Sequence, residues 1–234
     1  MKKLGLVGGI GPASTIDYYK GINDGYQKSL TNPAKSGENP PMIIDSLNLA
    51  VAYNLVEKKD WENFAKLFID SINILHNAGA EVAALSANTA HIVFDKVTAQ
   101  SPIPVIGLID ETCKVAKNKG CKKVIVFGTA FTMSSGMYEE QCSKHGIEAI
   151  APNEEQQQMI HNIIFPNLVS GIVTPEDKET ILGIAKELLA QHRADAIILG
   201  CTELPLIMEP SDLDAVLLDT TKIHIDAILK YITV

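Results

Sequence analysis

Short apolar runs alternate with amphipathic stretches along almost the whole chain. The apolar runs are rich in valine and isoleucine and end at glycine, proline or polar residues, which is typical of parallel strands covered on both faces. The stretches between them carry the periodicity of helices. We therefore predict an α/β fold of βαβ units. The predicted strands are 4–8, 42–46, 81–86, 105–108, 123–128, 147–151, 194–200 and 215–218, and the predicted helices are 14–30, 60–77, 111–119, 135–145, 154–168, 175–192 and 220–232.

Segments of the first half resemble segments of the second half in the same order, at a spacing of roughly 110–120 residues. This pattern indicates an internal duplication. The paired segments are Leu6-Val7-Gly8-Gly9 with Val126-Phe127-Gly128-Thr129, Val82 to Thr89 with Ala196 to Glu203, and Leu108 to Thr112 with Leu217 to Thr221.

The duplication predicts two pseudo-symmetric domains, each a mostly parallel sheet flanked by helices. We expect residues 1–100 plus 211–234 to form the first α/β domain and residues 101–210 the second. Ligands of open parallel sheets bind at the carboxyl ends of the strands, where the paired segments lie. We therefore expect the site in the cleft between the domains.

Composition excludes several classes of partner. The chain has 234 residues, 46% of them hydrophobic, a net charge of −8 and a pI near 5.2. An acidic chain with only small basic clusters is not expected to bind nucleic acid or an anionic membrane surface. No apolar run approaches the roughly 18 residues of a membrane span. The charged start is interrupted by glycines, so no export is expected, and four cysteines without CxxC spacing predict a reducing, cytoplasmic location.

Cys201 is the candidate for acid/base or nucleophilic chemistry. It follows a predicted strand and precedes a predicted helical turn, where backbone N–H groups and a helix dipole favour thiolate over thiol. Thr202 and Glu203 follow it, and a purely structural site seldom needs polar residues at that place. The other three cysteines, Cys113, Cys121 and Cys142, are expected to be passive.

Candidate groups for binding a carboxylate lie in the first half. Asn88 and Thr89 occupy the place that matches the Cys201 segment, and the loop from Gly8 to Thr15 allows an anion close to the backbone, with Ser14 or Thr15 capping the next helix. The loop fits neither nucleotide-binding fingerprint. His91 is expected to orient a neighbour, transfer a proton or cap its own helix. The one arginine, Arg193, is expected at the opposite end of the sheet, so no arginine clamp is predicted.

The chain also carries a set of motifs found together in one known family. They are Gly8-Gly9-Ile10-Gly11-Pro12, Asn88-Thr89-Ala90-His91, Gly128-Thr129 with Thr132-Met133, Ile163-Ile164-Phe165, Gly200-Cys201-Thr202-Glu203-Leu204 and Asp219-Thr220-Thr221-Lys222-Ile223-His224. This set resembles the aspartate/glutamate racemase family over nearly the whole chain.

The resemblance implies two α/β domains with the site between them, a homodimer, and chemistry that needs neither pyridoxal phosphate nor a metal. It implies that Cys201 is one of two cysteines that remove and return the substrate's α-proton from opposite faces. It further implies that Ile10, Asn88, Thr89, Thr129 and Thr202 contact the substrate, a small acidic amino acid or dicarboxylate; we add Glu203 to these candidate binding residues.

The chain departs from the family at Ala87, where the resemblance implies the second cysteine. A methyl group carries no exchangeable proton, and neighbouring Ser86 is expected to face the other way and to be a weak acid. Three hypotheses remain. The chain is an amino-acid racemase or isomerase that is sluggish or assisted by water, Ser86 or His91; or a single-cysteine decarboxylase or isomerase of a dicarboxylate; or a carboxylate-binding protein without catalysis.

Overall fold

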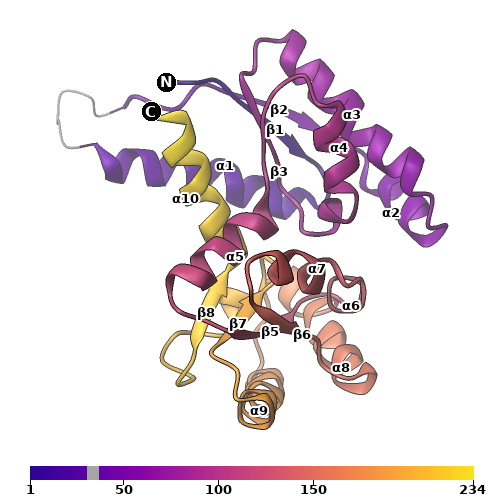
Figure 1. Cartoon of the computed structure of the whole chain (residues 1–234), viewed down its shortest axis with the longest axis vertical. Coiled ribbons are helices and arrows are strands. Elements are labelled where there is room, and N and C mark those ends of the chain that lie inside the picture. The colour runs from indigo at the N-terminus through magenta and orange to yellow at the C-terminus, as the bar shows by residue number, and fades with distance from the viewer. Residues whose placement is uncertain (31–36) are drawn as a thin grey trace. The chain divides into compact units, whose positions relative to one another are not determined.

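A computed structural model describes residues 1–30 and 37–234 of the chain (Figure 1). The described residues form two four-stranded parallel sheets, ordered β2-β1-β3-β4 and β6-β5-β7-β8, which confirms the predicted α/β class. The strands are β1 (Leu4–Gly8), β2 (Met42–Ser46), β3 (Val82–Leu85), β4 (Val105–Ile106), β5 (Lys123–Phe127), β6 (Glu148–Ile150), β7 (Ala196–Leu199) and β8 (Val216–Asp219).

The helices between the strands also follow the predicted order. Additional short helices appear where no helix was predicted, among them α2, α4 and α6. The α-helices are α1 (Pro12–Ser29), α2 (Leu49–Glu57), α3 (Trp61–Asn77), α4 (Phe94–Gln100), α5 (Leu108–Asn118), α6 (Ala130–Ser134), α7 (Met137–Lys144), α8 (Glu154–Ile164), α9 (Pro175–His192) and α10 (Thr220–Ile232). The 3-10 helices are η2 (Thr89–Val93), η3 (Leu168–Ser170) and η4 (Leu204–Leu206).

The chain divides into two units whose boundaries differ from the predicted ones. Residues 1–108 and 224–234 form the first unit, and residues 109–223 form the second. The predicted boundaries at 100/101 and 210/211 are wrong because strand pairing decides the membership. β4 pairs with β3, so residues 101–108 belong to the first unit. β8 pairs with β7, so residues 211–219 belong to the second unit, which continues into the start of α10 as far as residue 223.

The first unit buries its sheet between two layers of helices. On one face, Leu4 and Leu6 of β1 pack with α1 and α10. Gly21 of α1 lets α10 approach, because a Cβ at Gly21 would lie 2.6 Å from Ile225 Cδ1. On the other face, Val7 packs with phenylalanines of α3 and with residues of η2 and α4. Strand residues thus alternate between two cores, as a parallel sheet requires.

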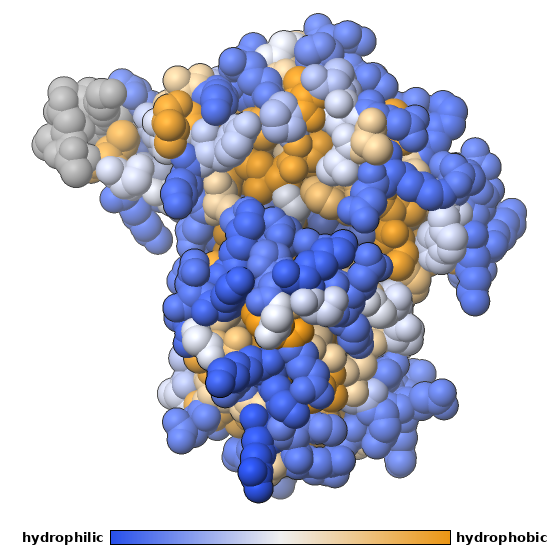
Figure 2. Space-filling view, viewed as in Figure 1, coloured by the Kyte–Doolittle hydropathy of each residue, from blue (hydrophilic) through white to orange (hydrophobic). Residues whose placement is uncertain are grey.

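The second unit repeats this plan. Ile125 and Phe127 of β5 and Ile197 and Leu199 of β7 pack against α8 and α9. Helices α5 and α7 lie together on the other face of the sheet, where Cys113 contacts Cys142 (Figure 1). In both units the exposed sides of the helices are mainly hydrophilic on the face shown in Figure 2. None of the described helices is long and apolar enough to cross a membrane.

Strand register tests the proposed duplication residue by residue. Leu4 pairs with Val82 in the first sheet, and Val124 pairs with Ala196 in the second. The first two segment matches are therefore confirmed.

The third match is displaced. Ile106 pairs with Ala84 and Leu218 pairs with Ile198, so Leu108 is equivalent to Thr220 and not to Leu217. The mismatch has a physical cause. The similar residues lie mainly on helix α5 in the first case and on strand β8 in the second, so they are not structurally equivalent.

Candidate active site

Candidate binding residues of the first unit lie at the carboxyl end of its sheet. β1 and β3 are neighbours, and the loop and turn that follow them carry Ile10, Asn88 and Thr89. All three residues are partly exposed, whereas β1 and β3 are buried throughout. The predicted binding residues of the first unit therefore lie along one edge of its sheet.

The loop after β1 is held by hydroxyl groups. Helix α1 begins at Pro12, after Gly11, so Ser14 and Thr15 lie within its first turn and the prediction that either caps it is wrong. Proline is well suited to the first helical position, which explains the early start. Thr15 Oγ1 instead accepts from Gly9 N–H at 2.9 Å, and Ser14 Oγ donates to Ser86 O at 2.7 Å.

Ala87, in the place where the family resemblance implies a cysteine, is also partly exposed and packs at the border of the first unit's core. Its neighbour Ser86 is buried, and the Ser86 hydroxyl donates to Val7 O at 3.1 Å. The Ser86 hydroxyl therefore has a structural hydrogen bond inside the sheet.

His91 follows on η2 and is buried. Its Nδ1 lies 3.0 Å from Ala87 O, and its Nε2 accepts from Leu108 N–H at 3.0 Å. Burial lowers the pKa of His91 to about 4, so the ring is neutral at neutral pH. Of the roles predicted for His91, orientation of its neighbours fits these contacts.

Candidate residues of the second unit lie at the equivalent edge of its own sheet, where β5 and β7 are neighbours. Thr129 follows β5, and Cys201, Thr202 and Glu203 follow β7; all are partly exposed. Cys201 Sγ donates to Glu203 Oε2 at 2.8 Å, and Thr202 Oγ1 donates to the same oxygen at 2.9 Å. One carboxylate oxygen of Glu203 therefore accepts two hydrogen bonds.

This arrangement overturns the expectation that Cys201 rests as a thiolate. Burial raises the pKa of the Cys201 thiol, and the negative charge and hydrogen bond of Glu203 raise it further, while backbone N–H groups of Glu203 and Thr202 act in the opposite direction. The predicted helix dipole is absent here because the turn after Cys201 is only the short η4. Cys201 is a protonated thiol next to a carboxylate acceptor.

Sequence reasoning missed His161 at this edge. Thr129 caps α6 by accepting from Thr132 N–H at 3.3 Å, and His161 Nδ1 accepts from Ala130 N–H at 3.3 Å. His161 lies on α8, two residues before the motif at 163–165, and nothing in its helical spacing distinguished it from a surface residue.

The remaining cysteines and the arginine lie away from these strand ends. Cys113 and Cys142 are buried on α5 and α7, and Cys121 is buried before the amino end of β5. Arg193 ends α9 ahead of β7, at the opposite end of that strand from Cys201. Within residues 1–30 and 37–234, no three His, Cys, Asp or Glu side chains converge in a way that would hold a metal ion.

Comparison with known proteins identifies the class. The model of the Asp/Glu/Hydantoin racemase family matches residues 7–228, and the chain belongs to that family. Among solved structures, the chain is similar to a candidate Asp/Glu racemase from Yersinia pestis, with 33% identity, full coverage of both chains and a TM-score of 0.92. It is also similar to an aspartate racemase homologue from Pyrococcus horikoshii OT3, with 31% identity, full coverage of both chains and a TM-score of 0.90.

Among characterised sequences, the chain is 27% identical to the broad specificity amino-acid racemase RacX of Bacillus subtilis over 93% of this chain and 92% of that protein. The predicted family and the two-sheet racemase fold are therefore confirmed. The family relationship also supports assignment to the racemase class of isomerases.

Proposed function

We propose that this chain exchanges the α-proton of an acidic amino acid, aspartate or glutamate, without a cofactor, and that Cys201 acts from one face of the α-carbon. The hydrogen bond from the Cys201 thiol to the Glu203 carboxylate is the observation that carries the proposal. It joins a proton donor to a proton acceptor at a partly exposed strand end, in a family of racemases.

The proposed step begins with transfer of the Cys201 thiol proton to Glu203. The resulting thiolate takes the proton from the substrate's α-carbon, and the electron pair of the C–H bond remains on that carbon as a carbanion. The new Cys201 thiol then returns a proton to the same face, and Glu203 gives its proton back to the Cys201 thiolate, which restores the starting state. In solvent, the thiol proton exchanges between these two events, so the substrate acquires solvent hydrogen and keeps its configuration.

On the face of the α-carbon opposite Cys201, we propose that the reaction is limited because Ala87 has no proton to donate. The Ser86 hydroxyl donates to Val7 O, and both ring nitrogens of His91 have partners, so neither is proposed as the second acid. We propose that water supplies the proton on this face. Inversion is then slower than exchange, because a positioned acid contributes about 10²–10⁴-fold to a proton transfer.

Substrate recognition is proposed to use residues from both sheet edges. Asn88, Thr89, Thr129 and Thr202, with the backbone near Ile10, would bind the carboxylate and amino groups through neutral hydrogen bonds. Arg193 lies at the other end of β7. Neutral donors bind a carboxylate more weakly than a bidentate arginine does, so modest affinity is expected. Homodimerisation and a cytoplasmic location stay predictions.

A second candidate function is decarboxylation or isomerisation of a dicarboxylate. The observation that favours it is the resting state of Cys201 as a thiol donor, because such a reaction needs only one proton delivered to one face of an enolate.

The test incubates each enantiomer of aspartate and glutamate with the protein in deuterated water. NMR follows α-deuteration, and chiral chromatography follows inversion. Faster deuteration than inversion supports the proposal. Carbon dioxide release from a substituted malonate, without deuteration of the amino acids, supports the second candidate. Binding of a dicarboxylate with no chemistry of either kind would contradict both and leave a carboxylate-binding protein.

A further inference from the structure

Ile106, Gly107 and Leu108 are the last residues of the first unit before the chain enters the second, and each of them contacts an aromatic ring. The boundary between the units lies at Leu108/Ile109. Ile106 O accepts from His224 Nε2 at 2.9 Å, and Leu108 N–H donates to His91 Nε2 at 3.0 Å. Between them, Gly107 lies against Phe94, since a Cβ at Gly107 would be only 2.8 Å from Phe94 Cζ. We call His91, Phe94 and His224 the ring clamp.

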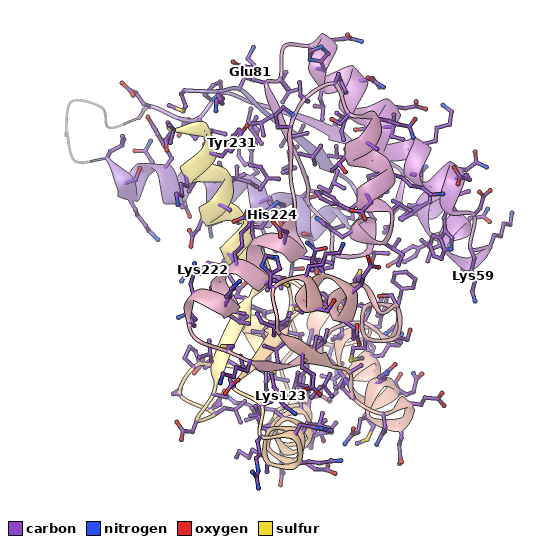
Figure 3. All side chains as sticks on the ribbon, in the orientation of Figure 1. Lys59, Glu81, Lys123, Lys222, His224 and Tyr231 are labelled. Atoms are coloured by element: carbon purple, nitrogen blue, oxygen red, sulfur yellow. The ribbon has the colours of Figure 1, made fainter. Side chains whose placement is uncertain are left out.

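The ring clamp is one connected assembly in which His91 and His224 are buried and Phe94 is partly buried. The His91 ring stacks on Phe94 with centroids 5.0 Å apart, and it meets the edge of His224 at 6.2 Å. His224, labelled on α10 in Figure 3, is held from its other side by Tyr18, whose hydroxyl lies 2.7 Å from Nδ1. Because Nε2–H donates to Ile106 O, Nδ1 is the acceptor of the Tyr18 proton.

His91 connects this clamp to the candidate active site. A carbonyl oxygen can only accept, so the Nδ1 that faces Ala87 O carries the proton. The Nε2 that accepts from Leu108 N–H is then unprotonated. The hydrogen-bond network therefore assigns His91 a single neutral tautomer in which both ring nitrogens are used. One rigid ring spans from the turn at Ala87 to the end of the first unit.

The second unit lacks this connection. Ser86 N–H donates to Val7 O and Gly200 N–H donates to Phe127 O, so Ser86 and Gly200 are equivalent. Pro205 follows Gly200 at the same distance as His91 follows Ser86, and proline has no ring nitrogen that can accept. Thr220, the equivalent of Leu108, instead donates its hydroxyl to Leu199 O at 2.9 Å. The link through His91 is specific to the unit that carries Ala87.

We propose that His91 is a positioning residue. It couples the conformation of the Ala87-Asn88-Thr89 turn to that of the backbone at Leu108, the last residue before the chain enters the second unit. The orientation of Asn88 and Thr89 then depends on both hydrogen bonds of the His91 ring. This inference rests on the proposed function for its kinetic consequence, because it makes proton exchange sensitive to a ring that does not touch the substrate. Small displacements of positioning groups are known to cost large factors in rate.

Two substitutions separate the two hydrogen bonds. The amide of His91→Asn reaches the position of Nδ1 and keeps the bond to Ala87 O, but it is too short to accept from Leu108. The amide of His91→Gln reaches the position of Nε2 and keeps the bond to Leu108, but it loses Ala87 O. Ile72→Val serves as the matched control, since Ile72 is fully buried in the same unit and lies outside the clamp.

The expected kinetic result is a fall of about tenfold in the maximal exchange rate for both His91 variants, with a smaller change in KM, while Ile72→Val stays within about twofold of the parent. Equal losses in all three variants would indicate a merely structural role and overturn the proposal. Unchanged kinetics in His91→Asn would overturn it too, because the coupling to Leu108 would then be irrelevant.

Backbone amide NMR tests the coupling even if the parent protein shows no exchange activity. In His91→Asn, which breaks only the distant bond, the amide signals of Asn88 and Thr89 are expected to shift and to exchange faster with solvent than in Ile72→Val. Changes confined to Leu108 would overturn the proposal. Failure of the proposed function alone would appear as an inactive parent protein with these NMR changes still present.

Discussion

The two units share a backbone plan but differ at the second residue after strands β3 and β7. Equivalent hydrogen bonds end β3 and β7, from Ser86 N–H to Val7 O and from Gly200 N–H to Phe127 O. The next residue is Ala87 in the first unit and Cys201 in the second. The two equivalent positions therefore carry a methyl group in the first unit and a thiol in the second.

The side chains that surround Ala87 also differ in chemistry from those that surround Cys201. Beside Cys201, a carboxylate accepts hydrogen bonds from the thiol and from Thr202. Beside Ala87, a neutral histidine holds the main chain, and the hydroxyl of Ser86 is committed to Val7. The edge at Cys201 thus places a thiol against a carboxylate, whereas the side chains of His91 and Ser86 beside Ala87 hydrogen-bond to the main chain.

Removing the thiol is expected to have the largest effect. Cys201→Ala should lower α-deuteration of the preferred enantiomer by about 10²–10⁴-fold, since no other group in the proposed step can accept the α-proton. NMR in deuterated water measures the loss. Cys121→Ala is the control, because Cys121 is a buried thiol before the opposite end of the same sheet. A Cys201→Ala protein that retains full rate would refute the assigned role.

Adding a thiol at position 87 of the first unit should bring the rate of inversion closer to the rate of α-deuteration. Ala87→Cys is expected to raise the rate of inversion by about 10²-fold, because a positioned acid replaces water on the second face. Ala87→Ser is the matched control, with a hydroxyl that is a much weaker acid and a correspondingly smaller gain. Chiral chromatography gives the rates. No gain from cysteine would mean that Ala87 does not face the α-carbon.

Neutralising Glu203 should change the pKa of the Cys201 thiol and the rate of α-deuteration in ways that can be measured separately. Glu203→Gln is expected to slow α-deuteration by about tenfold or more, because an amide does not take the thiol proton. The same change should lower the pKa of Cys201, since the Glu203 charge raises it, and alkylation of Cys201 by iodoacetamide should therefore become faster at a given pH. Glu209→Gln, an exposed carboxylate of the same unit, is the control. Slower alkylation would contradict the account.

Acidification should weaken the first unit through its buried histidines. Burial lowers the pKa of His91 to about 4 and that of His224 to about 3, both below the ordinary 6.5. Between pH 6.5 and 4 the unfolded chain binds more protons than the folded one, so the free energy of unfolding falls as the pH falls. The expected loss at pH 4 is on the order of 3 kcal/mol for each of the two histidines.

Urea denaturation of the His91→Asn variant measures this effect. Its stability should depend less on pH over that window than the stability of the parent. His76→Asn is the control because His76 is exposed on α3. Parallel curves for His91→Asn and the parent would show that His91 is not held neutral in the folded state.

The sequence pattern located most of the fold because its signals are local. The strand β1 and the helices α9 and α10 have the predicted bounds, since Thr174-Pro175 and similar signals mark where elements begin and end. Helix α2 was missed because its start is marked by Asn48 alone. The unit boundaries were misplaced because membership depends on which strands pair, and pairing is not a local property.

The candidate site was predictable as a set of residues but not as a set of interactions. Strand ends followed by polar residues pointed to Asn88 and Cys201, and the family resemblance added Thr129. The protonation state of Cys201 depends on the direction of the Glu203 side chain, and the role of His91 depends on a backbone amide contributed by Leu108. Such contacts arise only when the turns are folded, so sequence spacing gives no sign of them.

The most direct test of one-faced proton transfer is the ratio of α-deuteration to inversion for a single enantiomer in deuterated water. One-faced transfer by Cys201 predicts a ratio well above unity in the natural chain, falling towards unity in Ala87→Cys. A ratio near unity in the natural chain, for both enantiomers, would show that two positioned groups already act from opposite faces and would contradict the account.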